Sequence, residues 1–593
     1  MWWEQIFKSR SIWVGWVLVL ILGFSLRFWR LGLVPVGTYW DETAIWLDAK
    51  TLASTGHDIH GNTIFQAIFP SYGDYKLPVY IWLATASVAG FGSSSWAVRL
   101  PSALAGLGSL VLIAVLWQEL ISNQKNSEKF VWHWGGLIAA AILAISPWSL
   151  QFSRTAFEGH VGQFLLGISV WLLLKARKNW WYGPASAVFG GLAVYSYYSV
   201  RFVWPVLLMT LMSFFWLKQL PFGSVLTSKW YQWLKFGLNL GLTRIAVMGL
   251  IFLACLWPLV KSPLAREADQ FRLSTSSVLT LKDWPVVSNQ LREQAGNHIW
   301  DRVFYHRNWL LLQSLLVNYS KQFDLNYLFF TGDPNLRHGT GQVGLFYWWL
   351  LPSLLMGSYW WLTRRPLMGL FLFVWWLIAL LPASVPTDVP HALRSLNALL
   401  PITLILAAGV AIFMDVWLKQ IPDFKKRLGS NWSWLAISIL IIGVIFWNLG
   451  TYLRDYYGAY AERSAVAWQG GYADLAQKII SLNQISATTW IETKDEKFYL
   501  WLMLLLDQSA QSSLPKLEKN YLFTQIGPYQ INQVDWKAVV YDQTPMLVVM
   551  PTEALNLEIQ NRQLQPSWIE VKRSYPNSTS YSIAAFRWPS QYD

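Results

Sequence analysis

The ionisable residues that could do chemistry lie in short segments between long apolar runs. Asp41 and Glu42 open a segment whose apolar residues repeat at helical spacing. A carboxylate there is favoured by the helix dipole and can accept a proton from a hydroxyl group, although an ordinary acidic first turn would look the same. Lys76 follows, immediately before a second apolar run. Its ammonium group can bind a phosphate, or it can anchor the chain among lipid headgroups.

Further charged residues occupy segments that we expect on the same side of a membrane. Arg154 and Glu158 share a very short loop, where a structural ion pair is the alternative to a functional site. Arginine on the outer face opposes the positive-inside bias, so each one needs a local anion, for which phosphate is the natural choice. His298 and His306 show no metal-ligand spacing with a carboxylate, so the metal is unknown. The remaining candidates are Arg201, Arg337, His338, His391 and Arg394.

The composition indicates that these residues are positioned by membrane-spanning helices. Of the 593 residues, 54% are hydrophobic and 13% are charged, which excludes an ordinary soluble domain. Forty Trp suit two membrane–water interfaces lined by aromatic rings. The net charge of +13 lies between the apolar runs and not on a continuous basic face, so it favours a lipid bilayer as partner and argues against nucleic acid.

Eleven apolar runs approach the ~20 residues that a span requires. Residues 78–91 are too short, and we expect them to form a helix lying in the interface. With this assignment the Lys- and Arg-rich short loops all fall inside, so the chain is predicted to be a multi-pass protein of the plasma (inner) membrane. The predicted spans are 12–29, 97–117, 134–152, 160–174, 182–199, 202–217, 244–260, 343–362, 366–384, 397–417 and 433–451.

The predicted fold is a polytopic α-helical membrane protein with a small C-terminal α/β domain. Residues 1–451 form the transmembrane domain, with interfacial helices in the outer loop 30–96 and a second long outer loop at 261–342. Residues 452–593 form the extracytoplasmic tail. Its expected helices are 470–484 and 497–507, and its expected strands are 537–542, 545–551, 568–575 and 581–588.

The order of these features resembles the C-type glycosyltransferase superfamily, and within it the branch of bacterial protein O-mannosyltransferases and lipid A aminoarabinose transferases. The similarity covers about residues 1–420, while the tail matches no motif. The sequence has Glu158 where the family pattern has Asp, and Leu77 between Lys76 and Pro78. The motifs are Asp41-Glu42, Asp74-Tyr75-Lys76-Leu77-Pro78, Phe91-Gly92, Ala97-Val98-Arg99-Leu100-Pro101-Ser102, Ile145-Ser146-Pro147, Ser153-Arg154, Glu158, residues 327–338 and His391-Ala392-Leu393-Arg394.

This resemblance implies a membrane glycosyltransferase that moves a monosaccharide from a polyprenyl-phosphate donor to an acceptor hydroxyl at the outer face. Asp41 is then the candidate base, acting with inversion, and Lys76 the ligand of the lipid phosphate. Glu42 and Glu158 would position the acceptor or share a possible divalent cation. The acceptor is a protein, a lipid or a glycan. The arginines and histidines named above are the remaining candidate substrate ligands.

Two other functions remain open from the sequence. A transporter or scramblase of lipid-linked sugars would use the same cationic outer pocket for binding alone. It would also need residues on the cytosolic side, where only Lys and Arg attributable to topology are found. A receptor or scaffold built around the tail would leave the outer charges unexplained.

Overall fold

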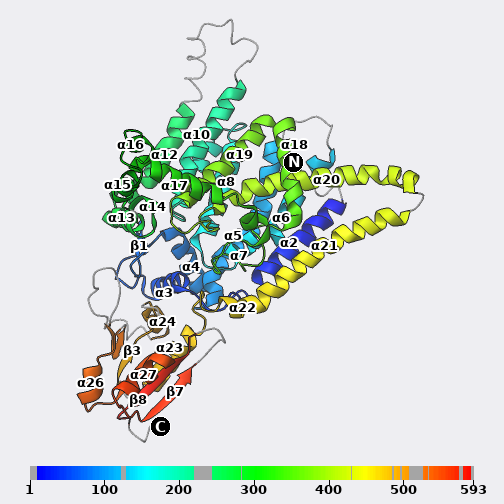
Figure 1. Ribbon diagram of the computed structural model, residues 1–593. Helices are drawn as coiled ribbons and strands as arrows, with labels where there is room; N and C mark the ends of the chain where they lie inside the picture. Colours follow the sequence, from blue (N-terminus) through cyan, green and yellow to red (C-terminus); the bar gives the residue numbers. More distant parts are fainter. Residues whose placement is uncertain are drawn as a thin grey trace. The chain divides into compact units, whose positions relative to one another are not determined.

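The chain forms two compact units, and each of them combines two segments that are far apart in the sequence. The computed structural model describes residues 10–121, 129–219, 243–281, 283–428, 431–483, 487–493, 497–506, 525–531, 533–572 and 579–588 (Figure 1). One unit, called here the helical unit, comprises Met1–Trp29 and Ser102–Leu453. The other, called the mixed unit, joins Arg30–Pro101 to Arg454–Asp593. The division predicted at residues 451 and 452 separates membrane from extracytoplasmic parts and stays a prediction.

The helical unit contains long apolar helices. Five helices of the described residues are long and apolar enough to cross a membrane, or seven if each of two bent pairs counts as one span. The pairs α6–α7 and α12–α13 bend by 62° and 81°, in each case where Pro begins the second helix. The five are α2 (Arg10–Phe28), α5 (Ser95–Ile121), the segment Pro366–Ser384 with α19 (Pro366–Leu380), the segment Leu396–Lys419 within α20 (Leu399–Leu428), and Leu435–Tyr457 within α21 (Asn431–Tyr457).

A polytopic helical membrane protein is therefore confirmed, while the count of eleven spans is not. Four predicted spans form helices that do not meet the same requirements for length and apolarity: α8 (Glu158–Lys175), α9 (Tyr182–Val194), α10 (Val200–Gln219) and α18 (Leu351–Arg364). α4 (Pro78–Phe91) is a short apolar helix, as predicted. The basic loop residues of 122–128 and 220–242 lie outside the described residues.

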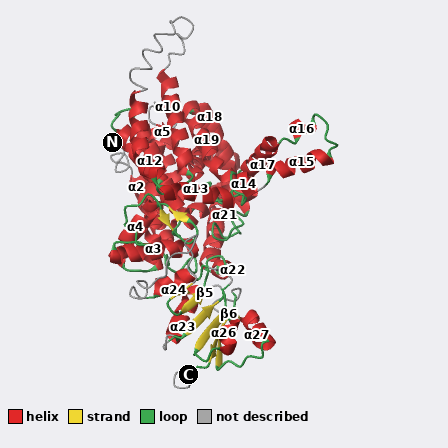
Figure 2. Ribbon diagram, turned by 90° about the vertical axis from the view of Figure 1, so that its left-hand side faces the viewer, coloured by secondary structure: helices red, strands yellow, loops and turns green. Residues whose placement is uncertain are grey.

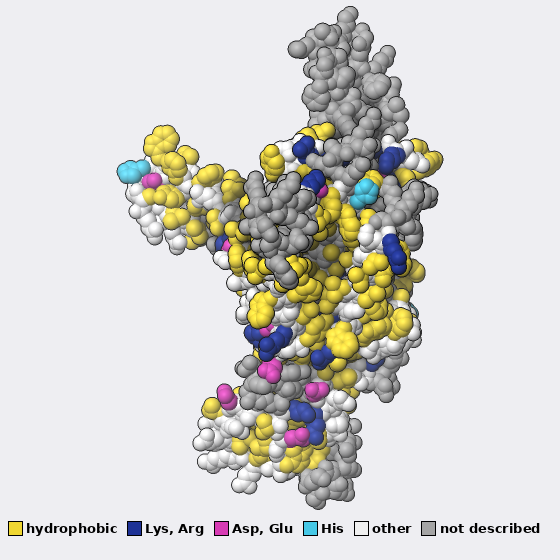
Figure 3. Space-filling model, turned by 90° about the vertical axis from the view of Figure 1, so that its right-hand side faces the viewer, with side chains coloured by type: hydrophobic (Ala, Val, Ile, Leu, Met, Phe, Trp, Pro, Cys, Tyr) yellow, Lys and Arg dark blue, Asp and Glu magenta, His cyan; other side chains and the backbone are white. Residues whose placement is uncertain are grey.

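The segment 261–342, predicted to lie outside, and the remaining short elements complete the helical unit. Hydrophobic side chains cover much of one face of the helical body (Figure 3), and large apolar residues on several of its helices are exposed. A lipid environment would cover such a surface. The elements are α6 (Lys129–Ile145), α7 (Pro147–Ser153), α12 (Thr243–Lys261), α13 (Pro263–Ser276), α14 (Val278–Leu281), α15 (Trp284–Gln294), α16 (Asp301–Phe304), α17 (Arg307–Lys321), the π-helix η2 (Asn326–Phe330), and the 3₁₀ helices η3 (Trp348–Leu350), η4 (Leu381–Ser384) and η5 (Leu396–Ala398).

The mixed unit combines the first outer segment with the tail. A six-stranded sheet has the strand order β4-β5-β3-β6-β8-β7, in which β3 runs parallel to β5 and β6 and the other pairs are antiparallel (Figure 2). Its elements are α3 (Trp40–Thr55), β1 (Phe69–Pro70), β2 (Tyr75–Lys76), α4, α22 (Ala459–Ser464), α23 (Tyr472–Leu482), β3 (Thr488–Ile491), α24 (Tyr499–Leu505), β4 (Gln525–Ile526), β5 (Tyr529–Ile531), α26 (Trp536–Tyr541), β6 (Met546–Pro551), α27 (Thr552–Asn561), β7 (Trp568–Lys572) and β8 (Tyr581–Phe586).

Both faces of this sheet are covered, because alternate residues of β6 and β8 enter two different apolar clusters. Leu547 and Val549 pack with α23, α24 and part of α3, whereas Met546 and Val548 pack with α26 and α27. The strand predicted at 537–542 is wrong. Those residues belong to α26, which begins after Asp535, whose side chain accepts hydrogen bonds from the amides of Lys537 and Ala538.

The predicted orientation can be tested by labelling single cysteines in a Cys255→Ser background. Lys178 lies in a predicted inner loop and Arg302 in a predicted outer segment, and both are exposed. We expect a membrane-impermeant maleimide to label the Arg302→Cys variant on intact cells, and the Lys178→Cys variant only after the cells are opened. Labelling of both variants from the same face would contradict the assignment.

Candidate functional site

Asp41 lies in the first turn of α3 and contacts two side chains of the neighbouring hairpin. The strands β1 and β2 pair Phe69 with Lys76, which places Lys76 opposite the start of the hairpin. The Lys76 ammonium group donates to Asp41 and, over 2.9 Å, to Asp74, while the hydroxyl group of Tyr72 also donates to Asp41. Lys76 is buried and Asp41 is 22% exposed. Asp41 and Lys76, both singled out from the sequence, thus form a direct ion pair.

Three groups around Asp41 decide its protonation. Burial alone would raise its pKa, and Asp74 would raise it further, but Lys76 and the Tyr72 hydrogen bond outweigh them and hold the pKa of Asp41 below its ordinary value. Asp41 is therefore ionised at neutral pH. A carboxylate bound to an ammonium group is a weak base, so any proton acceptance by Asp41 depends on where Lys76 points.

Glu42 has a different partner from its neighbour. Both its carboxylate oxygens accept hydrogen bonds from Arg99, at 3.2 and 2.8 Å, and both side chains are completely buried. Arg99 also donates to the backbone carbonyls of Leu31, Pro35 and Gly37. This arrangement gives Glu42 a positioning role at the start of α3, in place of the acceptor or metal contact expected from the sequence.

A second buried acid, Asp48, lies two turns further along α3. Burial raises its pKa well above the ordinary value, and nearby Asp58 adds to the rise. Its Oδ1 atom is buried without a hydrogen-bond partner among the described residues. Asp58, in contrast, accepts hydrogen bonds from the amides of His60 and Asn62 and from the side chains of Asn62 and Gln66. Asp58 therefore organises its own loop.

In the helical unit, Arg154 is completely buried at the C-terminal end of α2. Its guanidinium group donates to the carbonyls of Leu26, Arg27 and Trp29 at distances of 2.6 to 3.0 Å. Helix C-termini leave such carbonyls without intrahelical partners. Arg154 is thus accounted for as a cap of α2, and the ion pair with Glu158 that the sequence left open stays a prediction.

Glu158 and Arg201 lie at helix starts. Glu158 is the first residue of α8, and its carbonyl accepts a hydrogen bond from Ser196. Arg201 lies in the first turn of α10, stacks over the ring of Tyr198 and pairs with Asp269 at 2.9 Å. The anion that we expected beside Arg201 is therefore present as a protein carboxylate.

The other four predicted ligands lie in two loops that meet at Asp333. One Asp333 oxygen accepts from His338 Nδ1 at 2.9 Å and from the amide of Ala392 at 2.7 Å. The rings of His338 and His391 are 4.4 Å apart. Burial lowers the pKa of His391 well below its ordinary value, and His338, Arg394 and Arg337 lower it further. The structure thus brings together residues that were selected separately from the sequence, and Asp333, which was not selected, joins their two loops.

Asp333, His338 and His391 are also the one group in the described part of the chain whose donor types suit a metal ion. Their candidate ligand atoms lie within 4.8 Å of one another and all three residues are buried. Two histidines and a carboxylate are ligands that zinc and other transition metals accept. The hydrogen bond to Asp333 would leave His338 Nε2 as that residue's ligand atom.

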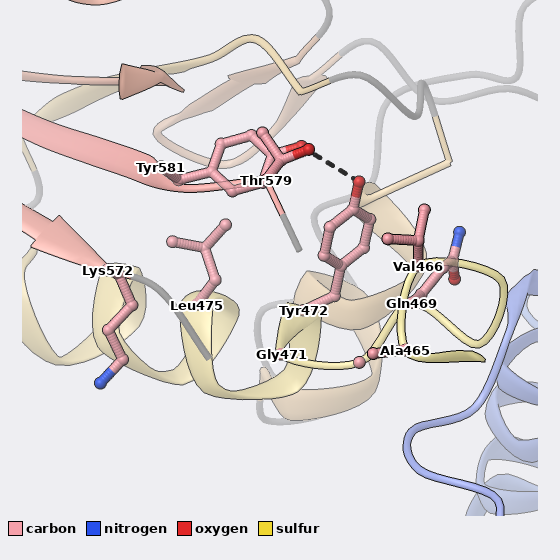
Figure 4. A pocket seen from close by; sticks show the side chains of 10 residues that line it. Ala465, Val466, Gln469, Gly471, Tyr472, Leu475, Lys572, Thr579 and Tyr581 are labelled. Carbon is pink, nitrogen blue, oxygen red and sulfur yellow. Dashed lines mark hydrogen bonds between the residues drawn. The ribbon is translucent and has the colours of Figure 1, made fainter. Parts of the chain in front are cut away.

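A cavity of the mixed unit lies apart from all predicted site residues. The hydroxyl groups of Tyr472 and Tyr581 are hydrogen-bonded at its edge, at 3.1 Å (Figure 4). The cavity has no acidic lining residue. Its lining is formed by Ala465, Val466, Gln469, Gly470, Gly471, Tyr472, Leu475, Lys572, Thr579 and Tyr581.

Comparisons with known proteins agree with this architecture. The family described as dolichyl-phosphate-mannose-protein mannosyltransferase matches residues 75–228. "Putative mannosyltransferase YkcB" of Bacillus subtilis strain 168 is 32% identical over 175 residues, which are 29% of this chain and 22% of that protein. The chain thus matches about a fifth of this relative's length. The family match begins at Tyr75, so it includes Lys76 and excludes Asp41.

Solved structures give the fold. ArnT from Cupriavidus metallidurans, in a crystal structure bound to undecaprenyl phosphate, superposes with a TM-score of 0.51 at 14% identity, covering 98% of this chain and 99% of that one. The archaeal oligosaccharyltransferase AglB from Archaeoglobus fulgidus gives a TM-score of 0.49 at 15% identity, covering 84% and 64%. The resemblance to the C-type glycosyltransferase superfamily predicted from the sequence is confirmed, and this chain has that fold.

Several residues of the α3 site were not singled out from the sequence. Tyr72 lies four residues before Lys76. The turn between β1 and β2 brings it to Asp41, and the spacing of residues in the sequence does not predict this contact. Arg99 belongs to a quoted motif, yet only its buried surroundings reveal that it binds Glu42. For Asp333 of the other group a signal existed, since it opens an Asp-Pro-Asn sequence that directly precedes two of the predicted ligands, Arg337 and His338.

The Glu42–Arg99 pair predicts a large effect on stability. The Glu42→Gln variant leaves the buried Arg99 without a countercharge, so we expect it to lose about 3–5 kcal/mol of unfolding free energy. Arg201→Met, which breaks the half-exposed pair with Asp269, is the matched control and should cost less than about 1 kcal/mol. Thermal unfolding in detergent measures both. Equal stability of the two variants would show that the Glu42 pair does not hold α3.

Proposed function

We propose that this protein is a membrane glycosyltransferase that moves a monosaccharide from a polyprenyl-phosphate donor to an acceptor hydroxyl at the outer face of the membrane, with inversion at the anomeric carbon. The observation that carries the proposal is the Asp41–Lys76 ion pair, with Tyr72 completing it. It brings together a carboxylate that can take a proton and a cation that can bind a phosphate. The superfamily fold and the mannosyltransferase family match support the same class of reaction.

In this mechanism the donor phosphate replaces Asp41 as the partner of Lys76. The sugar already carries a competent leaving group in its phosphate, so the reaction needs a cation near that phosphate more than a general acid. When Lys76 turns to the phosphate, Asp41 loses the stronger of the two groups that lower its pKa and keeps only the Tyr72 hydrogen bond, while burial and Asp74 still raise the pKa. Donor binding would thus convert a weak base into a stronger one when the acceptor hydroxyl has to lose its proton.

The remaining predicted residues divide into two groups under this proposal. Arg337, His338, His391 and Arg394 surround Asp333 and are proposed as further ligands of substrate, or of a divalent cation that Asp333 and the two histidines would hold. Glu158 stays a candidate for positioning the acceptor. The donor sugar is a hexose or a pentose, and the extracytoplasmic placement of the site rests on the charge pattern.

The base role of Asp41 is tested by Asp41→Asn, which removes proton acceptance with almost no change of volume. Transfer of labelled sugar to acceptor should fall about 10²- to 10⁴-fold, while donor binding remains. Asp48→Asn is a matched control on the same helix and should keep turnover within a few-fold. Normal turnover of the Asp41 variant would exclude it as the base. Loss of lipid binding together with turnover would assign it a structural or metal-related role.

Lys76→Met keeps the aliphatic stem and removes the charge. The dependence of kcat/KM on pH in this variant therefore reports on the Asp41–Lys76 ion pair. In the wild type the pKa of Asp41 is lowered, so Asp41 should not cause kcat/KM to fall until the pH drops below the ordinary carboxyl range. In the variant, burial and Asp74 both raise this pKa, and the acid limb should move to higher pH. Donor affinity should also fall roughly 10- to 100-fold, as expected for a lost charge-assisted contact.

The same assay, run in detergent where no second compartment exists, separates the transferase from a transporter. A wild-type protein that cleaves no sugar–phosphate bond, with several polyprenyl-phosphate sugars and an extract containing acceptors, would favour the transporter. Cleavage with an unchanged acid limb and unchanged affinity in Lys76→Met would keep the transferase and discard Lys76 as its phosphate ligand.

A further inference from the structure

Three helices of the segment 261–342 form an arm that projects from the rest of the helical unit (Figure 2). The arm, residues 284–321, runs outward along α15, turns at α16 and returns along α17. α15 and α17 pack against each other, and the hydroxyl group of Ser288 in α15 donates to the carbonyl of Tyr305, two residues before α17 begins. The arm is therefore a helical hairpin, and each of its two long helices has one side exposed.

The exposed side of α17 is apolar. Trp309, Leu312 and Leu316 are spaced so that they share one face of the helix, and each is 44 to 53% exposed. The turn around α16 carries further large apolar side chains, which are 60 to 76% exposed. Exposing such a surface to water is costly, so soluble monomers rarely do so over a contiguous area of this kind. The side chains of the turn are Ile299, Trp300, Val303 and Phe304.

The exposed side of α15 is polar instead. After the first turn of this helix, its exposed residues are Asn289, Gln290, Glu293 and Gln294. The polar and the apolar exposed residues of the hairpin thus lie on different helices. Neither helix is long enough to cross a membrane. A short segment that combines one apolar side with one polar side is typical of the membrane–water interface.

The base of the arm is attached to a helix that is long and apolar enough to cross the membrane. Asn318, in the last turn of α17, donates to the carbonyl of Ser384 at 3.1 Å, at the end of the candidate span Pro366–Ser384. The Tyr319 hydroxyl group donates to the carbonyl of Leu377 within that span at 3.0 Å, and Leu377 is itself exposed. The other end of the arm follows α14 and the bent pair α12–α13, which is also a candidate span. Candidate spans therefore flank the arm on both sides.

The partner that covers the apolar side must also suit two arginines. Arg302 in α16 and Arg307 at the start of α17 are exposed, and they adjoin the apolar residues of the turn in the sequence. An arginine in such a place lays its aliphatic stem on apolar surface and reaches a lipid phosphate with its guanidinium group. Tryptophan, here Trp300 and Trp309, is enriched at the same depth. A phospholipid bilayer supplies both hydrocarbon and phosphate, and it surrounds the helices from which the arm starts.

We propose that the arm binds the surface of the lipid bilayer, with the exposed side of α17 and the turn around α16 among the acyl chains and the exposed side of α15 in water. This inference does not depend on the function proposed above. It gives a membrane contact to a segment that the sequence places in an outer loop. Because α17 leads into η2 and then to Asp333, the contact also holds the loop of Asp333 close to the bilayer.

Single cysteines in a Cys255→Ser background measure this contact in the full-length protein. The variants Phe304→Cys and Leu312→Cys report on the apolar side, and Gln290→Cys is the matched control on α15. Each is labelled with a small fluorophore in nanodiscs whose phospholipids carry a nitroxide quencher near the headgroup. We expect the nitroxide to quench positions 304 and 312 at least about 2-fold more than position 290, as an interfacial helix requires. Aqueous iodide should quench in the opposite order.

Wild-type protein provides a second measurement that needs no variant to fold. A phospholipid with a photoreactive group on its acyl chain is activated in the same nanodiscs, and peptide mass spectrometry locates the adducts. We expect adducts in residues 299–317 and few in residues 286–297, because only the former carry the apolar side.

A pair of charge variants tests whether the apolar turn causes the insertion. Phe304→Asp places a carboxylate where hydrocarbon is expected, which is costly, so it should reduce the nitroxide quenching of a fluorophore at position 312. Gln290→Asp adds the same charge on α15 and should leave that quenching unchanged.

The outcomes decide between the bilayer and other partners. Positions 304 and 312 that iodide reaches and the nitroxide lipid does not, or wild-type protein without lipid adducts in residues 299–317, overturn the proposal. Equal quenching of all three positions by the nitroxide lipid contradicts the water-facing side of α15 and overturns it as well. Disulfide cross-linking of two Phe304→Cys chains in nanodiscs, without lipid quenching, would assign the apolar side to a second copy of this chain.

Discussion

The geometry of the α3 site depends on one buried ion pair that takes no part in the proposed chemistry. Arg99 binds both oxygens of Glu42 and the carbonyls of three residues between 31 and 37. Two charges removed from water are stable only when nearly all their hydrogen-bonding groups are satisfied, and here the guanidinium group donates five times. Because Asp41 immediately precedes Glu42, the pair fixes where Asp41 can point. A candidate base is thus held in place by its neighbour.

The proposed reaction needs this rigidity because the charges around Asp41 are closely balanced. A carboxylate with a lowered pKa is safely ionised but accepts a proton poorly, and a carboxylate without a cation has the opposite properties. The structure contains both influences at once, since burial and Asp74 oppose Lys76 and Tyr72. Movement of one ammonium group is enough to change which influence prevails. Small displacements of the hairpin that carries Lys76 would therefore change the basicity of Asp41 while leaving the shape of the α3 site nearly the same.

The sequence identified the residues with the right chemistry more reliably than their partners. Asp41 and Lys76 were both selected from the first outer segment and do form a pair, because charged groups in an apolar chain are few and each one needs a partner. Arg154 was selected for the same reason, yet it caps α2. An arginine that binds carbonyls and one that binds a phosphate have the same sequence signature. Burial, which separates them, depends on contacts between distant segments.

The prediction of helices and strands from the sequence is limited in the same way, because it does not include contacts between distant segments. Hydropathy located the long apolar helices, but averaging over a window carried the predicted span 134–152 across the bend where Pro147 begins a new helix. In the tail, the Val-rich run 537–542 suggested a strand, and the local cap formed by Asp535 favours a helix instead. Periodicity and residue type are local signals, so they fail where a single hydrogen-bonding side chain or a proline decides the conformation.

The composition of the mixed unit has a consequence for how the protein is made. Gly37 has a φ of +76°, and a side chain there would lie 2.5 Å from the carbonyl oxygen of Trp468, so the tail fits closely against the segment that Arg99 binds. Ala44 and Leu47 of α3 are buried in the same core as tail residues. During synthesis, all of residues 102–453 is added between these two parts. The apolar side of α3 therefore stays without its partner until the tail residues of the same core have been synthesised, and this protein should acquire its active form only after those strands emerge.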